Sequence, residues 1–279
     1  MTETTPASSS TIAIIGGGVM GGAIAASVRN GGWSAEAVTV ADRNTENLAD
    51  LAAAHGLVTT TSVAEAAAGA DVIVFAVKPQ DAAGVLAEFG SHVKPGAMLL
   101  TVAAGLPASF YEARLPAGTA VVRAMPNTPA LVGFGATAIA AGASATDAHL
   151  AVAARVLAAT GLVVTVAEGD INAVSTVSGS GPAYFYAFLE AMVEAGITQG
   201  LDRDVATALA RQTLIGAGRL LESSGATPGE LRSRVSSKGG TTLAALDAMH
   251  HAGLQTVVAV GLAAADRRAR ELAVELSGE

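Results

Sequence analysis

The sequence predicts two domains: an α/β domain built on a parallel, doubly wound sheet, and an all-α domain that follows it. In the first half, short β-branched runs alternate with alanine-rich helical stretches, which is the pattern of successive βαβ units. From Asn172 onward the strand pattern disappears and capped helical patterns follow one another. A chain of 279 residues is also long enough for two hydrophobic cores. We therefore expect a disordered tail at residues 1–10, the α/β domain at 11–166 and the helical domain at 167–279.

The α/β domain is expected to contain strands wherever short runs rich in Val, Ile, Leu and Ala occur. These runs are Ile12–Ile15, Val38–Ala41, Val72–Ala76, Met98–Thr101, Ala120–Arg123 and Thr137–Ala140. The helical patterns between them lie near Met20–Arg29, Leu48–Ala54, Ala82–Phe89 and Ala148–Ala159. From Val121 to Val166 the pattern does not give the order of the elements.

The second domain is expected to consist of helices with recognisable starts. Pro182 can start a helix that runs to about Gln199, and Asp202 can cap the next one, from Arg203 to Ser223. The segment Thr227-Pro-Gly-Glu230 has the spacing of a capping box with proline at the first helical position. Small apolar side chains are so frequent in this half that we expect it to pack against another copy of itself. The two remaining helices are expected at Thr242–His250 and Gln255–Leu276.

Composition excludes several classes of protein. The apolar content is 51% and the mean hydropathy is +0.48, yet no run approaches the roughly 18 apolar residues of a membrane-spanning helix. The absence of cysteine excludes disulfides, thiolate nucleophiles and thiolate-bound metals. With a net charge of −8 and basic residues clustered only at 267–270, a nucleic-acid partner is not expected. Residues 1–10 lack the features of a signal peptide, and we expect a cytoplasmic protein.

A glycine motif follows the first predicted strand directly. Gly16, Gly18 and Gly21 form G-x-G-x-x-G at the end of Ile12–Ile15. The first glycine allows a tight turn, the second lets the backbone approach a pyrophosphate, and the third permits close packing of helix and strand. A glycine-rich turn without a ligand is the alternative, but the strand before the motif and the βαβ pattern after it favour a Rossmann-type dinucleotide site.

The end of the second predicted strand bears on the choice between NAD and NADP. Asp42 can accept hydrogen bonds from ribose hydroxyls, which favours NAD. Arg43 can pair with a 2′-phosphate, with Asn44 assisting, which favours NADP. Either side chain can also simply face solvent. We expect NADP(H) to be preferred and NAD(H) to remain possible.

Later strand ends are expected to face the same crevice, since parallel strands present their carboxyl ends at one edge of the sheet. Phe75–Gln80 and Val102–Gly105 follow two of these strands. Lys78 can contact a phosphate or a ribose, or can lie in solvent. Asn127, in a stretch stiffened by prolines, can reach the nicotinamide side.

The segment Val235–Leu246 indicates a site for a small carboxylate. Two serines, two glycines and two threonines precede a helical pattern, and the amides at a helix start have no partners within the helix. A Ser/Thr-rich helix cap is the alternative interpretation. No His, Lys or Tyr stands where a ketone reductase needs its proton donor. An imine substrate that arrives protonated needs little acid catalysis, so amides and threonines suit it better.

These motifs together identify a known family. Ser178–Tyr184 and Val235–Thr242 resemble the pyrroline-5-carboxylate reductases. Four further segments match that family in the same order: Ile15–Gly21, Ala76–Pro79, Ala103–Gly105 and Met125–Pro129. The resemblance covers essentially the whole chain after the tail. It implies the last step of proline biosynthesis, in which NAD(P)H gives a hydride to C5 of the cyclic imine and L-proline forms. It also implies a dimer, or a larger assembly of dimers, with the substrate near the dimer interface.

The resemblance further implies roles for individual residues. Thr242 would hydrogen-bond the imine nitrogen as the catalytic residue, and Glu168 matches a position that lines the substrate site. The substrate carboxylate would be bound by backbone amides and a hydroxyl, from Ser237, Gly239, Gly240 and Thr241. The cofactor would contact Ile15, Gly16, Gly17, Gly18, Val19, Met20, Gly21, Asp42, Arg43, Asn44, Ser62, Ala76, Val77, Lys78, Pro79, Ala103, Ala104, Gly105 and Asn127.

Departures from the family pattern and two other functions remain open. Lys238 stands where the family usually has proline, and Arg234 and Ser62 replace cofactor-contacting asparagines of some members. A β-hydroxyacid dehydrogenase would carry a lysine where Gly179–Phe185 ends in phenylalanine. A non-catalytic dinucleotide sensor would bind NADPH without any turnover.

Overall fold

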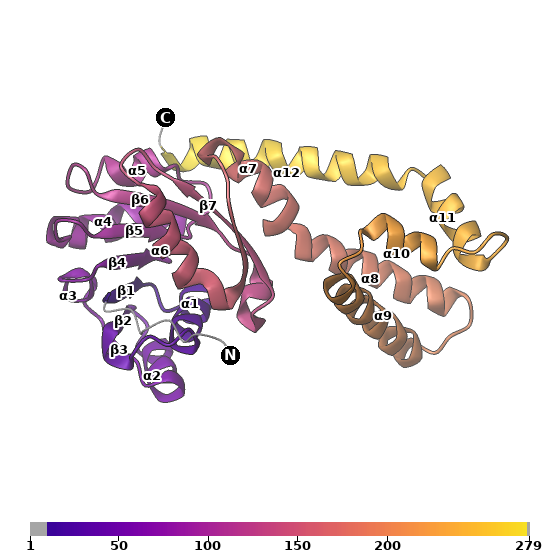
Figure 1. Ribbon diagram of the computed structural model, residues 1–279, viewed down its shortest axis with the longest axis horizontal. Coiled ribbons are helices and arrows are strands. Elements are labelled where there is room, and N and C mark those ends of the chain that lie inside the picture. The colour runs from indigo at the N-terminus through magenta and orange to yellow at the C-terminus, as the bar shows by residue number, and fades with distance from the viewer. Residues whose placement is uncertain (1–9, 278–279) are drawn as a thin grey trace. The chain divides into compact units, whose positions relative to one another are not determined.

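The computed structural model describes residues 10–277 of the chain (Figure 1). Apart from Ser10, the tail expected at residues 1–10 lies outside the described residues. The described chain forms two compact units. Residues 10–180 and 265–277 make up the first, and residues 181–264 make up the second.

An eight-stranded sheet forms the centre of the first unit, in the order β3-β2-β1-β4-β5-β6-β7-β8. The strands are β1 (Ile12–Ile15), β2 (Val38–Ala41), β3 (Val58–Thr60), β4 (Val72–Phe75), β5 (Met98–Thr101), β6 (Ala120–Met125), β7 (Gly135–Ala141) and β8 (Gly161–Thr165). Every residue of β1, β4 and β5 is buried, as expected for strands covered on both faces.

Helices cover both faces of this sheet. Apolar residues of α1 (Val19–Asn30), α2 (Thr45–His55) and α6 (Asp147–Leu157) pack against one face. On the other face lie α3 (Val63–Ala67), α4 (Ala82–Phe89) and α5 (Ala108–Glu112). The predicted doubly wound α/β domain is thereby confirmed.

The order in which strands are added to the sheet reverses at β1: β2 and β3 lie on one side of it, and β4 and β5 lie on the other. Strand β1 pairs with β2 on one side and with β4 on the other, both in parallel. The carboxyl ends of two neighbouring strands therefore diverge here into helices on opposite faces. Such a switch point leaves a crevice in which open α/β sheets bind ligands.

The part of the sheet whose order the sequence left open, from Val121 to Val166, departs from the parallel arrangement. Strand β7 runs antiparallel to β6, and β8 then pairs in parallel with β7. Only the 3₁₀ turn Thr128–Val132 lies in the connection between β6 and β7, which is too short for a crossover helix. The sequence pattern also missed β3 and β8, which are the two edge strands and are only partly buried.

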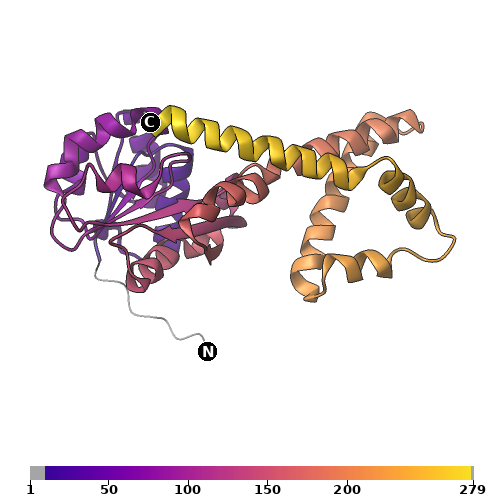
Figure 2. The same cartoon turned by 90° about the horizontal axis from the view of Figure 1, so that it is seen from above.

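The second unit is entirely helical among its described residues. It contains α8 (Gly181–Thr198), α9 (Arg203–Ser224), α10 (Pro228–Arg234), α11 (Thr241–His251) and the first part of α12 (Leu254–Ser277; yellow in Figure 2). The predicted caps are confirmed: the Asp202 side chain accepts the Asp204 amide, and Thr227 and Glu230 form the capping box. No described helix is both long and apolar enough to cross a membrane.

Candidate functional site

The glycine motif forms a tight turn between β1 and α1. Gly16 has φ of +101°, and a Cβ atom there would lie 2.6 Å from the carbonyl oxygen of Ala76. A Cβ atom on Gly21 would collide with the carbonyl oxygen of Gly16. Gly18 is the N-cap of α1, and its position carries no side-chain cap. The first-turn amides of α1 therefore face the end of β1 without a capping side chain, which suits a pyrophosphate.

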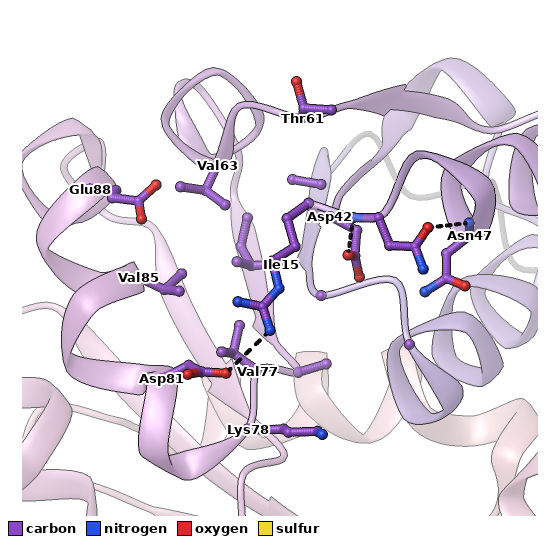
Figure 3. Close-up of a pocket in the computed structure, with 16 residues that line it drawn as sticks. Ile15, Asp42, Asn47, Thr61, Val63, Val77, Lys78, Asp81, Val85 and Glu88 are labelled. Carbon is purple, nitrogen blue, oxygen red and sulfur yellow. Dashed lines mark hydrogen bonds and ion pairs between the residues drawn. The ribbon is translucent and has the colours of Figure 1, made fainter.

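A cavity of about 470 Å³ opens at this switch point (Figure 3). Its walls come from the ends of β1, β2 and β4 and from the start of α4. Most of the predicted cofactor residues from these elements line it, namely Ile15, Gly16, Gly18, Asp42, Arg43, Asn44, Ala76, Val77 and Lys78. Its volume and position suit the adenosine and phosphate part of a dinucleotide.

The carboxylate of Asp42 is engaged with the backbone on both oxygens. Oδ2 accepts the Gly17 amide at 2.6 Å, and Oδ1 accepts the Asn44 amide at 2.8 Å. Asn44 in turn caps α2, where its side-chain oxygen accepts the amides of Glu46 and Asn47. Asp42 and Asn44 thus hold the glycine turn and the start of α2 in place.

Arg43 projects from the same turn toward the cavity. Its side chain is 89% exposed, and its guanidinium lies 3.9 Å from the carboxylate of Asp81, on the opposite wall. An ion pair this exposed contributes little to stability, so the guanidinium is available to an anionic ligand. Lys78 lines the cavity beside Asp81 (Figure 3).

A second, smaller cavity of about 300 Å³ also lies in the first unit. Three predicted cofactor residues line it: Pro79, Ala104 and Gly105. The rest of its described lining is Gln80, Met125, Ile171, Asn172, Ser175, Ala269 and Leu272, none of which the sequence predicted as site residues. Pro79 and Lys78 are adjacent in the chain, so the two cavities follow one another along the ends of the parallel strands.

Glu168 forms a partly buried ion pair three residues before Ile171, which lines this second cavity. Its Oε1 lies 2.9 Å from Nη1 of Arg123 and also accepts the Ala108 amide at 2.6 Å. Only 9% of the Arg123 side chain is exposed. The neighbouring Tyr111 hydroxyl accepts a hydrogen bond from Thr101. Burial raises the pKa of Tyr111 to about 12, while the Thr101 bond and the Arg123 charge oppose that rise.

The remaining predicted cofactor residues do not line either cavity. Ser62 caps α3 by accepting the Glu65 amide, while its neighbours Thr61 and Val63 line the larger cavity. Asn127 is buried, donates to the Ser178 carbonyl at 3.0 Å and accepts the Ala136 amide at 2.8 Å. The others are Gly17, Val19, Met20, Gly21 and Ala103, of which Val19 is 68% exposed.

The predicted carboxylate segment lies in the second unit, at the start of α11. Gly239 has φ of +74°, and the Gly240 amide donates to the Ser237 carbonyl at 3.0 Å. Gly240 is the N-cap, with no side-chain cap, so the interpretation of this segment as a Ser/Thr helix cap is wrong. Thr241 and Thr242 are the first residues of the helix and are exposed, as is Lys238.

Comparison with known proteins adds evidence for both parts of the chain. Residues 168–272 match the family model "Pyrroline-5-carboxylate reductase dimerisation", and residues 11–105 match "NADP oxidoreductase coenzyme F420-dependent". The pyrroline-5-carboxylate reductase of Pseudomonas aeruginosa is 40% identical, over 95% of this chain and 97% of its own length. The pyrroline-5-carboxylate reductase of Mycobacterium tuberculosis is 39% identical, over 94% of this chain and 97% of its own length. The chain belongs to the pyrroline-5-carboxylate reductase family.

Solved structures agree with this assignment. A pyrroline-5-carboxylate reductase from Coxiella burnetii superposes with a TM-score of 0.91, at 33% identity, covering 95% of this chain and 99% of that one. The Plasmodium falciparum pyrroline carboxylate reductase, solved with NADP bound, gives a TM-score of 0.81 at 25% identity. The match covers 96% of this chain and 99% of the Plasmodium chain. The chain is accordingly a dinucleotide-binding oxidoreductase of this family.

Two residues, Arg123 and Ser175, were not predicted as site residues, and only Arg123 has a signal in the sequence. Arg123 stands in an otherwise apolar strand, where a charged residue requires a partner. Ser175 lies in a π-helical turn, Ser175–Gly179, just before Pro182. Such turns are frequent at functional sites, but their i→i+5 hydrogen bonds leave no pattern in the sequence.

Proposed function

We propose that this protein reduces 1-pyrroline-5-carboxylate to L-proline, with NADPH as the preferred hydride donor. The observation that carries the proposal is the pairing of two features in one reductase-family chain. A dinucleotide cavity lies at the β1–β4 switch point, and an uncapped Gly-Gly-Thr-Thr sequence opens α11. The first feature suits the cofactor, and the second suits a small carboxylate substrate.

The residues around the larger cavity fit a bound NADP(H). A side chain at Gly16 or Gly21 would fill the space that the backbone needs for its close turn, so these glycines keep the end of β1 open. Gly18 and the first-turn amides of α1 would bind the pyrophosphate. Bound in this way, NADPH supplies a hydride to the imine carbon. The smaller cavity, beyond Pro79, would hold the nicotinamide.

The chain's own residues bind and orient the substrate. The amides of Gly239, Gly240 and Thr241, with the Ser237 hydroxyl, would bind its carboxylate at the helix start. The Thr242 hydroxyl would hydrogen-bond the imine nitrogen and present C5 for hydride addition. Since the nitrogen of a protonated imine already carries its proton, the reaction needs no acidic side chain beside it.

The preference for NADPH rests on the different situations of Asp42 and Arg43. Both carboxylate oxygens of Asp42 accept backbone amides, which reduces its capacity to bind ribose hydroxyls. Arg43 carries a planar guanidinium that can bind a 2′-phosphate with two hydrogen bonds. The Plasmodium relative was solved with NADP bound, which also supports this preference.

The direct test follows the oxidation of NADPH and of NADH by absorbance, with pyrroline-5-carboxylate as substrate. We expect turnover with both and a larger kcat/KM with NADPH. Turnover with NADH alone would overturn the cofactor preference. NADPH binding without oxidation would instead support a non-catalytic sensor. The dimerisation match supports self-association, whereas the cytoplasmic location stays a prediction from the sequence.

A further inference from the structure

Two polar side chains, Arg123 and Asn127, stand on an otherwise apolar face of the β6 strand and its extension. Arg123, Met125 and Asn127 alternate along the chain, so their side chains share one face. All three lie against residues 168–179, the segment that follows β8. Arg123 pairs with Glu168, and Asn127 donates to the Ser178 carbonyl. Between them, Met125 packs with Ile171, and its Cε would lie 2.8 Å from a Cβ atom on Gly179.

The segment fixed in this way forms one wall of the smaller cavity. Ile171, Asn172 and Ser175 line that cavity, together with Met125. The Glu168–Arg123 contact holds the beginning of the segment, and the Asn127–Ser178 contact holds its end. Both anchors also reach a second element, since Glu168 accepts the Ala108 amide at the start of α5 and Asn127 accepts the Ala136 amide in β7.

The burial of Arg123 costs free energy, which indicates a role of this residue beyond stability: it fixes the position of the segment that it contacts. Burying a guanidinium carries a desolvation penalty that apolar packing would avoid, and buried ion pairs often add little net stability. The segment also contains the π-helical turn Ser175–Gly179, in which the Ser180 amide donates to the Ser175 carbonyl. π-helical turns are rare and are frequently found at functional sites.

We propose that Arg123 and Asn127 are positioning residues, which hold residues 171–175 in the place that hydride transfer requires. Neither touches a reacting atom; they act through the wall of the smaller cavity. The inference rests on the proposed function, because that cavity is where the nicotinamide would lie. A misplacement of about 1 Å at such a wall can lower turnover by about a hundredfold.

The test uses substitutions that change one contact at a time in the full chain. Asn127→Asp keeps an acceptor for the Ala136 amide but replaces the donor to Ser178 with a carboxylate oxygen. Arg123→Lys keeps the charge opposite Glu168 but loses the planar guanidinium. The matched control is Asp71→Asn, which removes the ion pair with Lys94 (2.6 Å), outside the residues that line either cavity.

Kinetic constants are measured per active site, with sites counted by NADPH binding. We expect kcat/KM for the imine to fall by about tenfold to a hundredfold in both variants. The affinity for NADPH, set mainly in the larger cavity, should stay unchanged, and Asp71→Asn should keep wild-type kinetics. Variants with lowered melting temperatures but wild-type kinetics per site would overturn the proposal, since the contacts would then be structural only.

Hydrogen exchange separates this inference from the proposed function. We expect amides of residues 171–178 to exchange faster in Asn127→Asp and Arg123→Lys than in the wild type or in Asp71→Asn. Unchanged exchange would overturn the positioning role even if activity fell. A wild-type protein that fails to reduce the imine would overturn the proposed function, and the exchange data would still decide whether β6 holds this segment.

Discussion

At the scale of single residues, the adjacent residues Asp42 and Arg43 have different roles. Asp42 holds the glycine turn and the start of α2 through backbone amides, while Arg43, the next residue, faces the cavity. The residue type alone did not distinguish these roles, because an aspartate at a strand end can accept hydrogen bonds either from ribose hydroxyls or from backbone amides. The hydrogen bonds of Asp42 make the distinction.

Arg43 and Asp81 should affect NADPH in opposite directions. Arg43→Ala should raise KM for NADPH by about tenfold or more, because a charge-assisted bond is lost, and leave KM for NADH nearly unchanged. Asp81→Asn frees the guanidinium from its weak pair and should lower KM for NADPH by about two- to fivefold. Initial rates with each cofactor check both effects, and Glu88→Gln on the same wall is the control. Equal changes in KM for NADH would show that Arg43 does not bind the 2′-phosphate.

Thr242 should matter for turnover more than for cofactor binding. In Thr242→Ala the imine nitrogen loses its hydrogen bond, so kcat should fall by about tenfold or more. The dissociation constant of NADPH, measured by fluorescence, should not change. Thr242→Ser, which keeps the hydroxyl, should retain most of the activity. Equal activity in the alanine and serine variants would exclude the proposed role.

Tyr111 should make stability depend on alkaline pH. Its pKa is about 12 in the folded protein because of burial, against about 10 when unfolded. Between these values the unfolded chain has lost a proton that the folded chain keeps, so the free energy of unfolding falls as pH rises. From about pH 9 to about pH 11 the loss should be about 1 kcal/mol. In Tyr111→Phe, the free energy of unfolding measured with urea should lack this part of the decline with pH. The same pH dependence in the variant and the wild type would contradict the raised pKa of Tyr111.

At the scale of elements, the glycine turn shows how one missing side chain sets a helix position. Helix α1 approaches β1 so closely that a Cβ atom on Gly21 would meet the backbone of Gly16. The motif could be recognised from sequence, since its spacing after a strand is characteristic. The antiparallel β7 and the edge strands β3 and β8 were not recognised, because pairing direction depends on partners that are distant in the sequence.

Gly21→Ala should therefore separate α1 from the sheet. We expect loss of NADPH binding and a lower melting temperature, since the collision is with backbone, which cannot rotate away. Gly84→Ala in α4 is the matched control, because a Cβ atom there meets nothing within 4 Å. In that exposed helical position alanine should stabilise by about 0.5–1 kcal/mol. Wild-type NADPH affinity in Gly21→Ala would show that the close packing is dispensable.

At the scale of the whole molecule, the second unit has too little core of its own. Its buried hydrophobic cluster among the described residues is Val193, Ala206 and Ala210. Large apolar side chains remain exposed along α8 and α12, including Phe185 at 62% and Val257 at 67%. Apolar surface of this kind marks an association surface, in agreement with the dimerisation model matched over residues 168–272.

Val257→Glu should weaken self-association. A charge placed in an apolar interface costs several kcal/mol, so dimers should dissociate at protein concentrations about a hundredfold higher or more. Light scattering over a dilution series measures this, and the melting temperature should fall with it. Ala53→Glu, at an exposed position of α2, is the control for added charge. An unchanged mass in Val257→Glu would place the interface elsewhere.

The sequence by itself determined the two-part architecture, the glycine turn, the helices of the second half and the family, because each depends on local spacing or on motifs continuous in the chain. Only the tertiary structure decided which groups meet across long separations. Arg123 and Glu168 pair across 45 residues, and Asn127 and Ser178 across 51, because β6 and the segment after β8 come together only after the sheet has formed. Their side chains satisfy buried hydrogen-bonding groups, and no local pattern in the chain specifies such partners.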